Sequence, residues 1–236
     1  MFSERITELR QSCSILGQTE REFFNSAELN KSLSQLPRHH LCARALFFVH
    51  LYGLFEFCIN SAVSEYLRFL EEQKLPVKRY TNGALLYALD SNFKALESSN
   101  NSSNLLNKRK TFLTALHAET VPSLSDSMFA KNLQNIGSKQ FAELFEWLDL
   151  KQRPFPEELL TKRGLLDVVV EKRRSVSHGR EAPSVVGVQV GGIDEINVAL
   201  EAIISYVEYF FNCIEIHITN NDFVDATPAT PVLGLA

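Results

Sequence analysis

One short run in the C-terminal third of the chain combines a permanent cation with a group that titrates near neutral pH. It reads Lys-Arg-Arg-Ser-Val-Ser-His-Gly over residues 172–179. The guanidinium of Arg173 stays charged and can hold a phosphate through two parallel hydrogen bonds, whereas the imidazole of His178 can accept and donate protons near pH 7. Together these are two of the groups needed to cut RNA without a metal ion.

The bare spacing of an arginine and a histidine is a weak signal, because this composition predicts about one chance match at gaps of roughly four to six residues. A second match does occur, between Arg44 and His50. It lies in the most apolar predicted helix, where the simpler interpretation is a pair of satisfied polar groups in or near the core.

The Arg173/His178 match has a context that the other match lacks. It follows a long apolar segment, and Gly179 directly after it indicates a helix end or a tight turn. Further positive charge surrounds it, from Lys162, Arg163, Lys172, Arg174 and Arg180. The alternative interpretation of the same residues is a solvated basic helix end that complements the helix dipole.

The spacing itself sets a geometric demand. In a continuous helix the side chains of Arg173 and His178 would point about 140° apart, because five residues at 3.6 residues per turn overshoot one turn. A working site therefore requires either that the helix breaks between them or that two copies of the chain pool their side chains across a dimer.

Almost the whole sequence has the apolar spacing of helices. From Leu41 to Phe69 apolar residues recur at alternating steps of four and three, and a second row that begins at Phe47 makes this helix apolar on most sides. Such a helix is expected at the centre of a bundle. Residues 3–35 indicate one or two amphipathic helices. The only strand candidate, residues 185–190, is too short to build a sheet alone.

The expected organisation is a single all-α domain over residues 1–222, followed by a loose tail at 223–236. Its core helices are predicted at about 38–73, 156–178 and 193–218. Between them, at about 77–150, the pattern weakens into a helical insert of shorter helices that surround a polar, exposed stretch at 98–104.

The composition is that of an ordinary globular protein, with 45% hydrophobic and 22% charged residues among 236. The net charge of −4 means that RNA binding would need a local basic patch. The four cysteines have no zinc-ligand spacing, so neither a metal site nor a cofactor is expected. The N-terminus lacks an apolar signal core, and the apolar stretch 41–63 carries the ionisable residues Arg44, His50 and Glu56, so we expect a cytoplasmic protein without a membrane span.

Residues 170–179 resemble the Arg-x4-His motif of HEPN-superfamily ribonucleases, several of which have arginine, a polar residue, any residue, an aliphatic residue, a small residue, histidine and glycine. Residues 51–57, Leu-Tyr-Gly-Leu-Phe-Glu-Phe, are similar to the apolar helix with an embedded acid of one prokaryotic HEPN nuclease subgroup. The resemblance covers about residues 38–73 and 156–218. It departs at Arg174, where Asn, Asp or His is common, which leaves a helper role at that position open.

The resemblance implies an all-α HEPN-like helical bundle that acts as a metal-independent endoribonuclease, usually dimeric and often a toxin or an antiviral, abortive-infection effector. The 2′-hydroxyl of RNA would be the nucleophile, with His178 as general base or acid and Arg173 on the scissile phosphate. The expected partners are RNA, a second copy that shares the active site, and a cognate antitoxin or regulatory protein. Supporting roles are expected for Arg174, Ser177 and Glu56, and RNA binding for Lys172, Arg180, Lys162 and Arg163.

Other polar and aromatic groups have plainer interpretations. Glu56 could orient Arg173 or His178, or it could pair with Arg44 or His50. Residues 38–40 are interpreted as a solvated helix start, and the basic residues 108–110 as an exposed helix face that could also grip an RNA backbone. Phe141, Phe145 and Trp147 are expected in the core or in a dimer interface. The alternative functions are a non-catalytic HEPN-type module for nucleotide binding, RNA binding or assembly, and a helical scaffold with a chance motif.

Overall fold

The computed structural model describes residues 2–25, 32–98, 102–118, 124, 133–150 and 155–225. Within these ranges the chain is helical, and the β-type pairing is limited to an isolated antiparallel bridge between Tyr80 and Val224. The predicted all-α fold class is confirmed. The helices are α1 (Phe2–Asn25), η1 (Leu33–Gln35), α2 (Arg38–Glu72), η2 (Val77–Arg79), α3 (Asn82–Ala88), α4 (Asp90–Glu97), α5 (Ser102–Leu116), α6 (Ser138–Trp147), α7 (Glu157–Thr161), α8 (Arg163–Ser177), α9 (Pro183–Gln189) and α10 (Ile193–Thr219).

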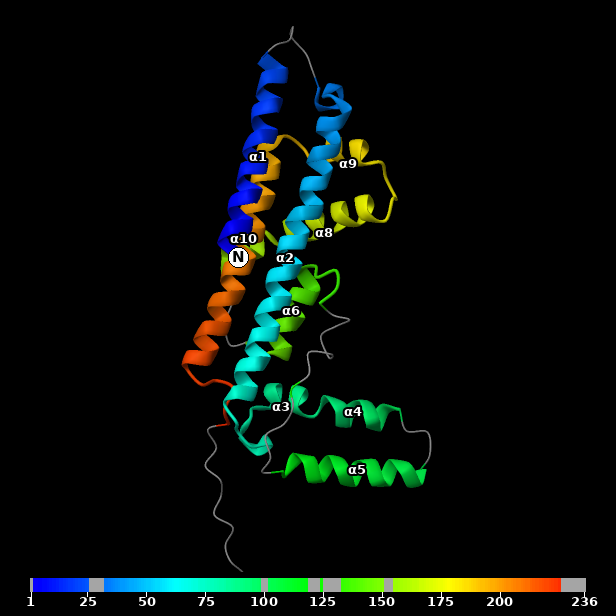
Figure 1. Ribbon diagram of the computed structural model, residues 1–236, viewed down its shortest axis with the longest axis vertical. Helices are drawn as coiled ribbons and strands as arrows, with labels where there is room; N and C mark the ends of the chain where they lie inside the picture. Colours follow the sequence, from blue (N-terminus) through cyan, green and yellow to red (C-terminus); the bar gives the residue numbers. More distant parts are fainter. Residues whose placement is uncertain are drawn as a thin grey trace, which may run out of the picture.

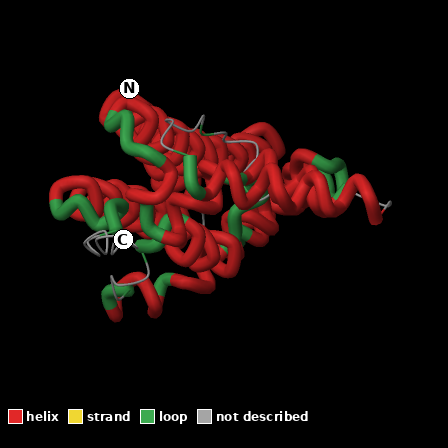
Figure 2. Tube along the Cα trace, turned by 90° about the horizontal axis from the view of Figure 1, so that it is seen from below, coloured by secondary structure: helices red, strands yellow, loops and turns green. Residues whose placement is uncertain are grey.

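Three long helices, α1, α2 and α10, run along the long axis of the molecule, and α8 and α9 lie beside α2 (Figure 1). The helices α4 and α5 form an antiparallel pair that projects from one end of this bundle. The view from below shows the same all-helical arrangement (Figure 2). The helices α3 to α6 fall in the predicted insert, so the expectation of shorter helices there is confirmed.

The helix α2 occupies the central position because its apolar side chains lie on most of its sides. It packs against α1, α8, α9 and α10. By length and composition α2 would also qualify to cross a membrane, a test that the core helix of a bundle passes as well. Half of its most apolar 18-residue window is buried inside the protein, and this half packs between helices.

A buried ion pair near the start of α2 joins four helices. Arg44 is completely buried, and its Nη1 donates to the carboxylate of Glu20 on α1. Its Nε donates to the carbonyl of Gly187 on α9 at 3.1 Å. The other carboxylate oxygen of Glu20 accepts from the amide of Ile193, the first residue of α10, at 3.3 Å. This one pair therefore fixes α1, α9 and α10 to α2.

The structure also shows where the two residues of the second arginine–histidine match, Arg44 and His50, lie. Arg44 lies in the core as predicted, but the prediction was wrong for His50, which is exposed. Six residues along a helix correspond to about 240° around its axis, so the two side chains cannot share one buried face. The expected solvated start of α2 was likewise wrong for His40, which is buried near Arg44, although Arg38 and His39 are exposed.

Two predicted elements differ from those observed. The helix predicted at 156–178 is divided at Lys162 into α7 and α8. The carbonyl of Leu159 accepts a hydrogen bond from the Tyr206 hydroxyl of α10, at 2.8 Å, at the position where a continuous helix would use it internally. Residues 185–189 of the strand candidate lie in α9, which begins with Pro183 and has Val190 as its C-cap. Packing of α9 against α2 overrides the β-propensity of its valines.

Most other element predictions are confirmed. The helix predicted at about 193–218 is α10, which has buried residues from Ile196 to His217, and Phe141 and Phe145 lie in the core with Trp147 packed against it. In the polar stretch at 98–104, Ser98 is exposed and α5 begins at Ser102, whereas residues 99–101 lie outside the described ranges. The predicted tail also lies outside them from residue 226 onward.

The contact between α9 and α2 depends on the absence of a side chain at Gly187. A Cβ atom there would lie 2.0 Å from the carbonyl oxygen of Leu41, which is backbone and cannot move aside alone.

We expect Gly187→Ala to lower the free energy of unfolding by about 3 kcal/mol or more, measured by urea denaturation. Gly53→Ala is the matched control, because a Cβ there meets nothing within 4 Å. It should raise stability by roughly 0.5–1 kcal/mol, and equal midpoints for both variants would contradict this account.

The buried His40 predicts a pH-dependent stability. Burial first, and then the charge of Arg44, lower the pKa of His40 below its ordinary value of 6.5, although Glu20 opposes the shift. Between the lowered folded-state pKa and about 6.5 the unfolded chain binds more protons, so stability should fall as pH falls through this window. We expect His40→Gln to make the loss of melting temperature between about pH 7.5 and pH 5.5 shallower than in wild type. The same substitution at exposed His39 serves as control, and identical slopes for the two variants would refute the assignment.

Candidate active site

The helix α8 places Arg173 against α2 because Arg173 continues its apolar stripe. Leu166, Val169 and Val170 are buried, and Arg173 follows Leu166 by seven residues, which is close to two full turns. The side chain is partly buried as a result. Arg173 is therefore positioned by the same periodicity that packs α8 into the core.

Two contacts hold the guanidinium of Arg173. Its Cζ lies 4.9 Å from the centre of the Tyr52 ring on α2, within the range of a cation–π interaction. Its Nη1 donates a hydrogen bond of 2.7 Å to Oδ1 of Asn135, in the loop before α6. The described residues offer no other hydrogen bond to this guanidinium, so its remaining N–H groups are available to a ligand.

The loop 133–138 also contacts α2 beside Arg173. The amide of Asn135 donates to Oε1 of Glu56 at 3.3 Å, and the same oxygen accepts from the Tyr52 hydroxyl at 3.3 Å. Glu56 thus contacts two neighbours of Arg173, while Arg44 pairs with Glu20 instead. The predicted alternative in which Glu56 pairs with Arg44 is therefore wrong, whereas a role for Glu56 toward Arg173 stays a prediction.

The Tyr52 hydroxyl remains a hydrogen-bond donor at neutral pH. Burial raises the pKa of Tyr52 well above its usual value, and the nearby Glu56 carboxylate raises the pKa further. A hydrogen bond from the backbone of Ile136 and the charge of Arg173 act in the opposite direction. A protonated Tyr52 can therefore donate to Glu56 and present its ring to Arg173 at the same time.

His178 lies at the end of α8 in a different orientation from Arg173. The helix continues through Ser177, so the predicted alternative of a break between the two residues was wrong. Gly179 has a φ of 64°, and the amides of Gly179 and Arg180 donate to the carbonyls of Val176 and Ser175. This is a Schellman motif, which confirms the helix end predicted from Gly179. His178 itself is exposed.

The predicted basic residues divide into two groups. Lys172, Arg174 and Arg180 lie at the C-terminal end of α8 beside His178, and Ser177 donates to the Arg173 carbonyl at 2.7 Å. Lys162 and Arg163 lie at the opposite end of α8, roughly 15 Å or more from Arg173 at 1.5 Å per residue. The structure therefore does not bring this second pair to the motif.

The hydrogen bonds of the basic residues at the C-terminal end of α8 also differ. Lys172 donates to Gln189 of α9 at 2.6 Å, and Gln189 in turn donates to Glu181 at 2.6 Å. Arg180 lies 3.8 Å from Glu171 in an exposed pair, which contributes little binding energy. Arg174 has no hydrogen bond or ion pair to the described residues, so it is the freest cation beside His178.

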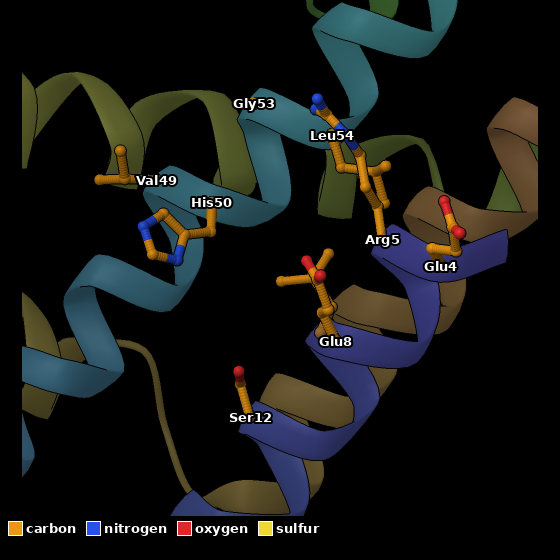
Figure 3. A pocket seen from close by; sticks show the side chains of 9 residues that line it. Glu4, Arg5, Glu8, Ser12, Val49, His50, Gly53 and Leu54 are labelled. Carbon is orange, nitrogen blue, oxygen red and sulfur yellow. The ribbon is translucent and has the colours of Figure 1, made fainter. Parts of the chain in front are cut away.

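A separate groove of about 860 Å³ lies between α1 and α2 and includes His50 (Figure 3). Glu4, Glu8 and Ser12 of α1 line its other side. Arg5 also lines the groove, so its two carboxylates are only partly offset, and none of the predicted site residues lines it. Among the described residues no three His, Cys, Asp or Glu side chains are grouped so that they could hold a metal ion.

Sequence reasoning missed Asn135. The local pattern Asn-Ile-Gly-Ser indicates a turn before a helix, and Asn135 does adopt a left-handed backbone with a φ of 56°. Nothing local indicates its contact with Arg173, which follows 38 residues later. A pairing at this separation depends on how the insert folds back onto α8.

Comparison with known proteins gives one family. A family model described as RiboL-PSP-HEPN matches residues 2–220. This span is wider than the resemblance found from the motifs, because it includes α1 and the insert. Neither the curated proteins nor the solved structures contain a match to the chain.

Proposed function

Because this chain belongs to the RiboL-PSP-HEPN family of the HEPN superfamily, we propose that it is an endoribonuclease that cuts RNA by attack of the 2′-hydroxyl. The observation that carries the proposal is the geometry of Arg173. Its guanidinium is held by Tyr52 and Asn135, and only one of its nitrogens donates a hydrogen bond to the described residues. A held cation with free donors suits the equatorial oxygens of a phosphodiester in the transition state.

The reaction needs a proton acceptor and a proton donor. The 2′-oxygen bonds to phosphorus, the bond from phosphorus to the 5′-oxygen breaks, and the products are a 2′,3′-cyclic phosphate and a 5′-hydroxyl. A neutral His178 takes the proton of the 2′-hydroxyl, and a protonated imidazole returns one to the departing 5′-oxygen. Arg173 offsets the charge on the phosphoryl oxygens, so this scheme assigns no step to a metal ion.

The site is shared between two copies of the chain in this proposal. Within one copy α8 continues past Arg173, so His178 emerges about 140° around the helix from it. A second copy can bring its own His178 close to Arg173, so that each of two sites pairs Arg173 of one copy with His178 of the other, and this histidine first takes and then returns the proton. Arg174, Arg180 and Lys172 add positive charge for the RNA backbone at this end of α8.

The proposal extends to the cellular role. We place the protein in the cytoplasm of a prokaryotic cell as a toxin or antiviral effector that a cognate antitoxin or regulatory protein restrains. The alternative, a non-catalytic module that binds RNA or a nucleotide or serves assembly, is favoured by the exposure of His178 in the single copy. RNA binding without cleavage would distinguish this alternative from the enzyme.

The first test is cleavage of an RNA oligonucleotide in excess chelator. We expect wild type to cut it and to leave intact the same oligonucleotide with deoxyribose at the cut position, because the 2′-hydroxyl is the nucleophile. Loss of the general acid–base group in His178→Ala should slow cleavage by roughly 100- to 10,000-fold, and Arg173→Ala should slow it comparably. His50→Ala is the matched control, an exposed histidine on α2 whose loss should leave the rate unchanged. Undiminished cleavage by His178→Ala would eliminate the assigned site.

The second test asks whether the site is shared. An inactive Arg173→Ala protein and an inactive His178→Ala protein are mixed, allowed to exchange subunits and assayed on the same oligonucleotide. If one copy supplies Arg173 and the other supplies His178, each mixed dimer regains one intact site, and we expect up to half of the wild-type activity per mixed dimer. A mixture as inactive as its two components would contradict this division of the two residues.

A further inference from the structure

We infer that Asn135 is a positioning residue, which holds Arg173 in the orientation that receives an RNA phosphodiester. The inference rests on the proposed function of Arg173. It adds a residue from the insert to a site whose other members lie on α2 and α8.

The contacts of Arg173 leave most of its binding capacity free. A guanidinium has five N–H donors, and the 2.7 Å bond to Asn135 uses one nitrogen, Nη1. The guanidinium carbon lies 4.9 Å from the centre of the Tyr52 ring, a cation–π contact that is not counted as a hydrogen bond. Asn135 thus sets the orientation of the guanidinium. Because this group is planar, its unused N–H donors can bind two oxygens of one phosphate.

The chemical type of the acceptor matters as much as its position. An amide oxygen holds the guanidinium without cancelling its charge, whereas a carboxylate there would form an ion pair that competes with phosphate. A carboxylate is in fact nearby, but Oε1 of Glu56 accepts from the Tyr52 hydroxyl and from the Asn135 amide. The described residues show no hydrogen bond between Glu56 and Arg173. Asn135 therefore contributes twice: its side-chain oxygen accepts from Arg173, and its backbone amide donates to Glu56.

The loop that carries Asn135 is fixed well enough to position another residue. Ile136 is completely buried next to it, and Leu133 is buried two residues before it. On the other side, the amide and the hydroxyl of Ser138 donate to the two carboxylate oxygens of Asp167, at 2.8 and 2.7 Å. Asp167 lies on α8, six residues before Arg173. Ser138 at the start of α6 thus attaches the end of the loop to α8, and the backbone amide of Asn135 attaches the loop to Glu56 of α2, so Asn135 has a defined place relative to the guanidinium.

The test uses the full chain with two substitutions at one position. Asn135→Gly removes the acceptor but keeps a residue that tolerates the left-handed backbone. Asn135→Asp keeps an acceptor of the same size, which also tolerates this backbone, and adds a negative charge. Gln134→Gly is the matched control, because it adds the same backbone freedom one residue earlier, where the side chain is exposed. Each substitution is also made in Arg173→Ala, so that an effect transmitted through Arg173 can be separated from an effect on the loop.

Three quantities are measured for each protein. A mixed-sequence 2′-O-methyl oligoribonucleotide, which has no free 2′-hydroxyl and cannot be cut by the proposed chemistry, reports the dissociation constant by fluorescence anisotropy. The unmodified oligonucleotide of the same sequence reports cleavage, and a thermal scan reports folding. We expect both Asn135 variants to weaken binding and to lower kcat/KM by about 10-fold or more, as for a lost or misdirected hydrogen bond to a charged group. Their melting temperatures should match that of Gln134→Gly, and neither change should have a further effect in Arg173→Ala.

The opposite results are equally clear. The inference is overturned if Asn135→Gly binds and cuts like Gln134→Gly, or if it weakens Arg173→Ala as much as it weakens wild type. If Asn135→Asp binds and cuts like wild type, the claim that the acceptor at position 135 must be neutral is wrong. If the wild-type protein binds the 2′-O-methyl oligonucleotide through Arg173 but leaves the unmodified one intact, the endoribonuclease proposal fails while the positioning role of Asn135 stands. A wild-type protein that neither binds nor cuts these RNAs would overturn both.

Discussion

The arrangement of this bundle depends on covering α2, whose apolar residues lie on too many sides for one neighbour to bury. The helices α1, α8, α9 and α10 each cover a different sector of it. The buried pair of Arg44 and Glu20 determines how three of them meet α2, because its hydrogen bonds also reach the carbonyl of Gly187 and the amide of Ile193. Removing two charges from water offsets much of their attraction, so a buried pair adds less to net stability than to the definition of one geometry. The apolar contacts supply the driving force for packing, and the ion pair fixes the positions of α9 and α10 along α2.

The same requirement decides the geometry of the candidate site. To cover its sector of α2, α8 must direct Leu166, Val169 and Val170 inward, and the helical repeat then carries Arg173 to the same face. His178 cannot follow, because it lies five residues later on a helix that stays regular through Ser177. The separation of the two side chains within one copy is thus a consequence of core packing. Core packing thereby leads to the proposed shared active site, in which the second side chain comes from another subunit.

The sequence predicted those features that local periodicity controls. The long apolar rows of α2 and α10 gave their bounds to within a residue, and Gly179 marked the end of α8. The failures come from contacts between distant segments. The valines of 185–190 favour a strand by composition, but close packing at Gly187 places them in a helix. His40 and His50 were each assigned the wrong environment, since the spacing along α2 says which residues share a face and not which face a neighbour covers. The motif residues were found because they are local, and Asn135 was missed because its partner follows 38 residues later.

The environment of Arg173 meets two requirements that oppose each other. A phosphate-binding arginine must be oriented, which calls for a hydrogen-bond acceptor, and it must stay uncompensated, which excludes an anionic one. Direct contact with Glu56 would satisfy the first requirement and defeat the second. The structure separates them, since the neutral amide of Asn135 orients the guanidinium, while the Tyr52 hydroxyl and the Asn135 backbone engage the carboxylate of Glu56. The insert is consequently part of the site. Without the loop before α6, α2 and α8 would leave the arginine beside an acid with nothing between them to hold the two apart.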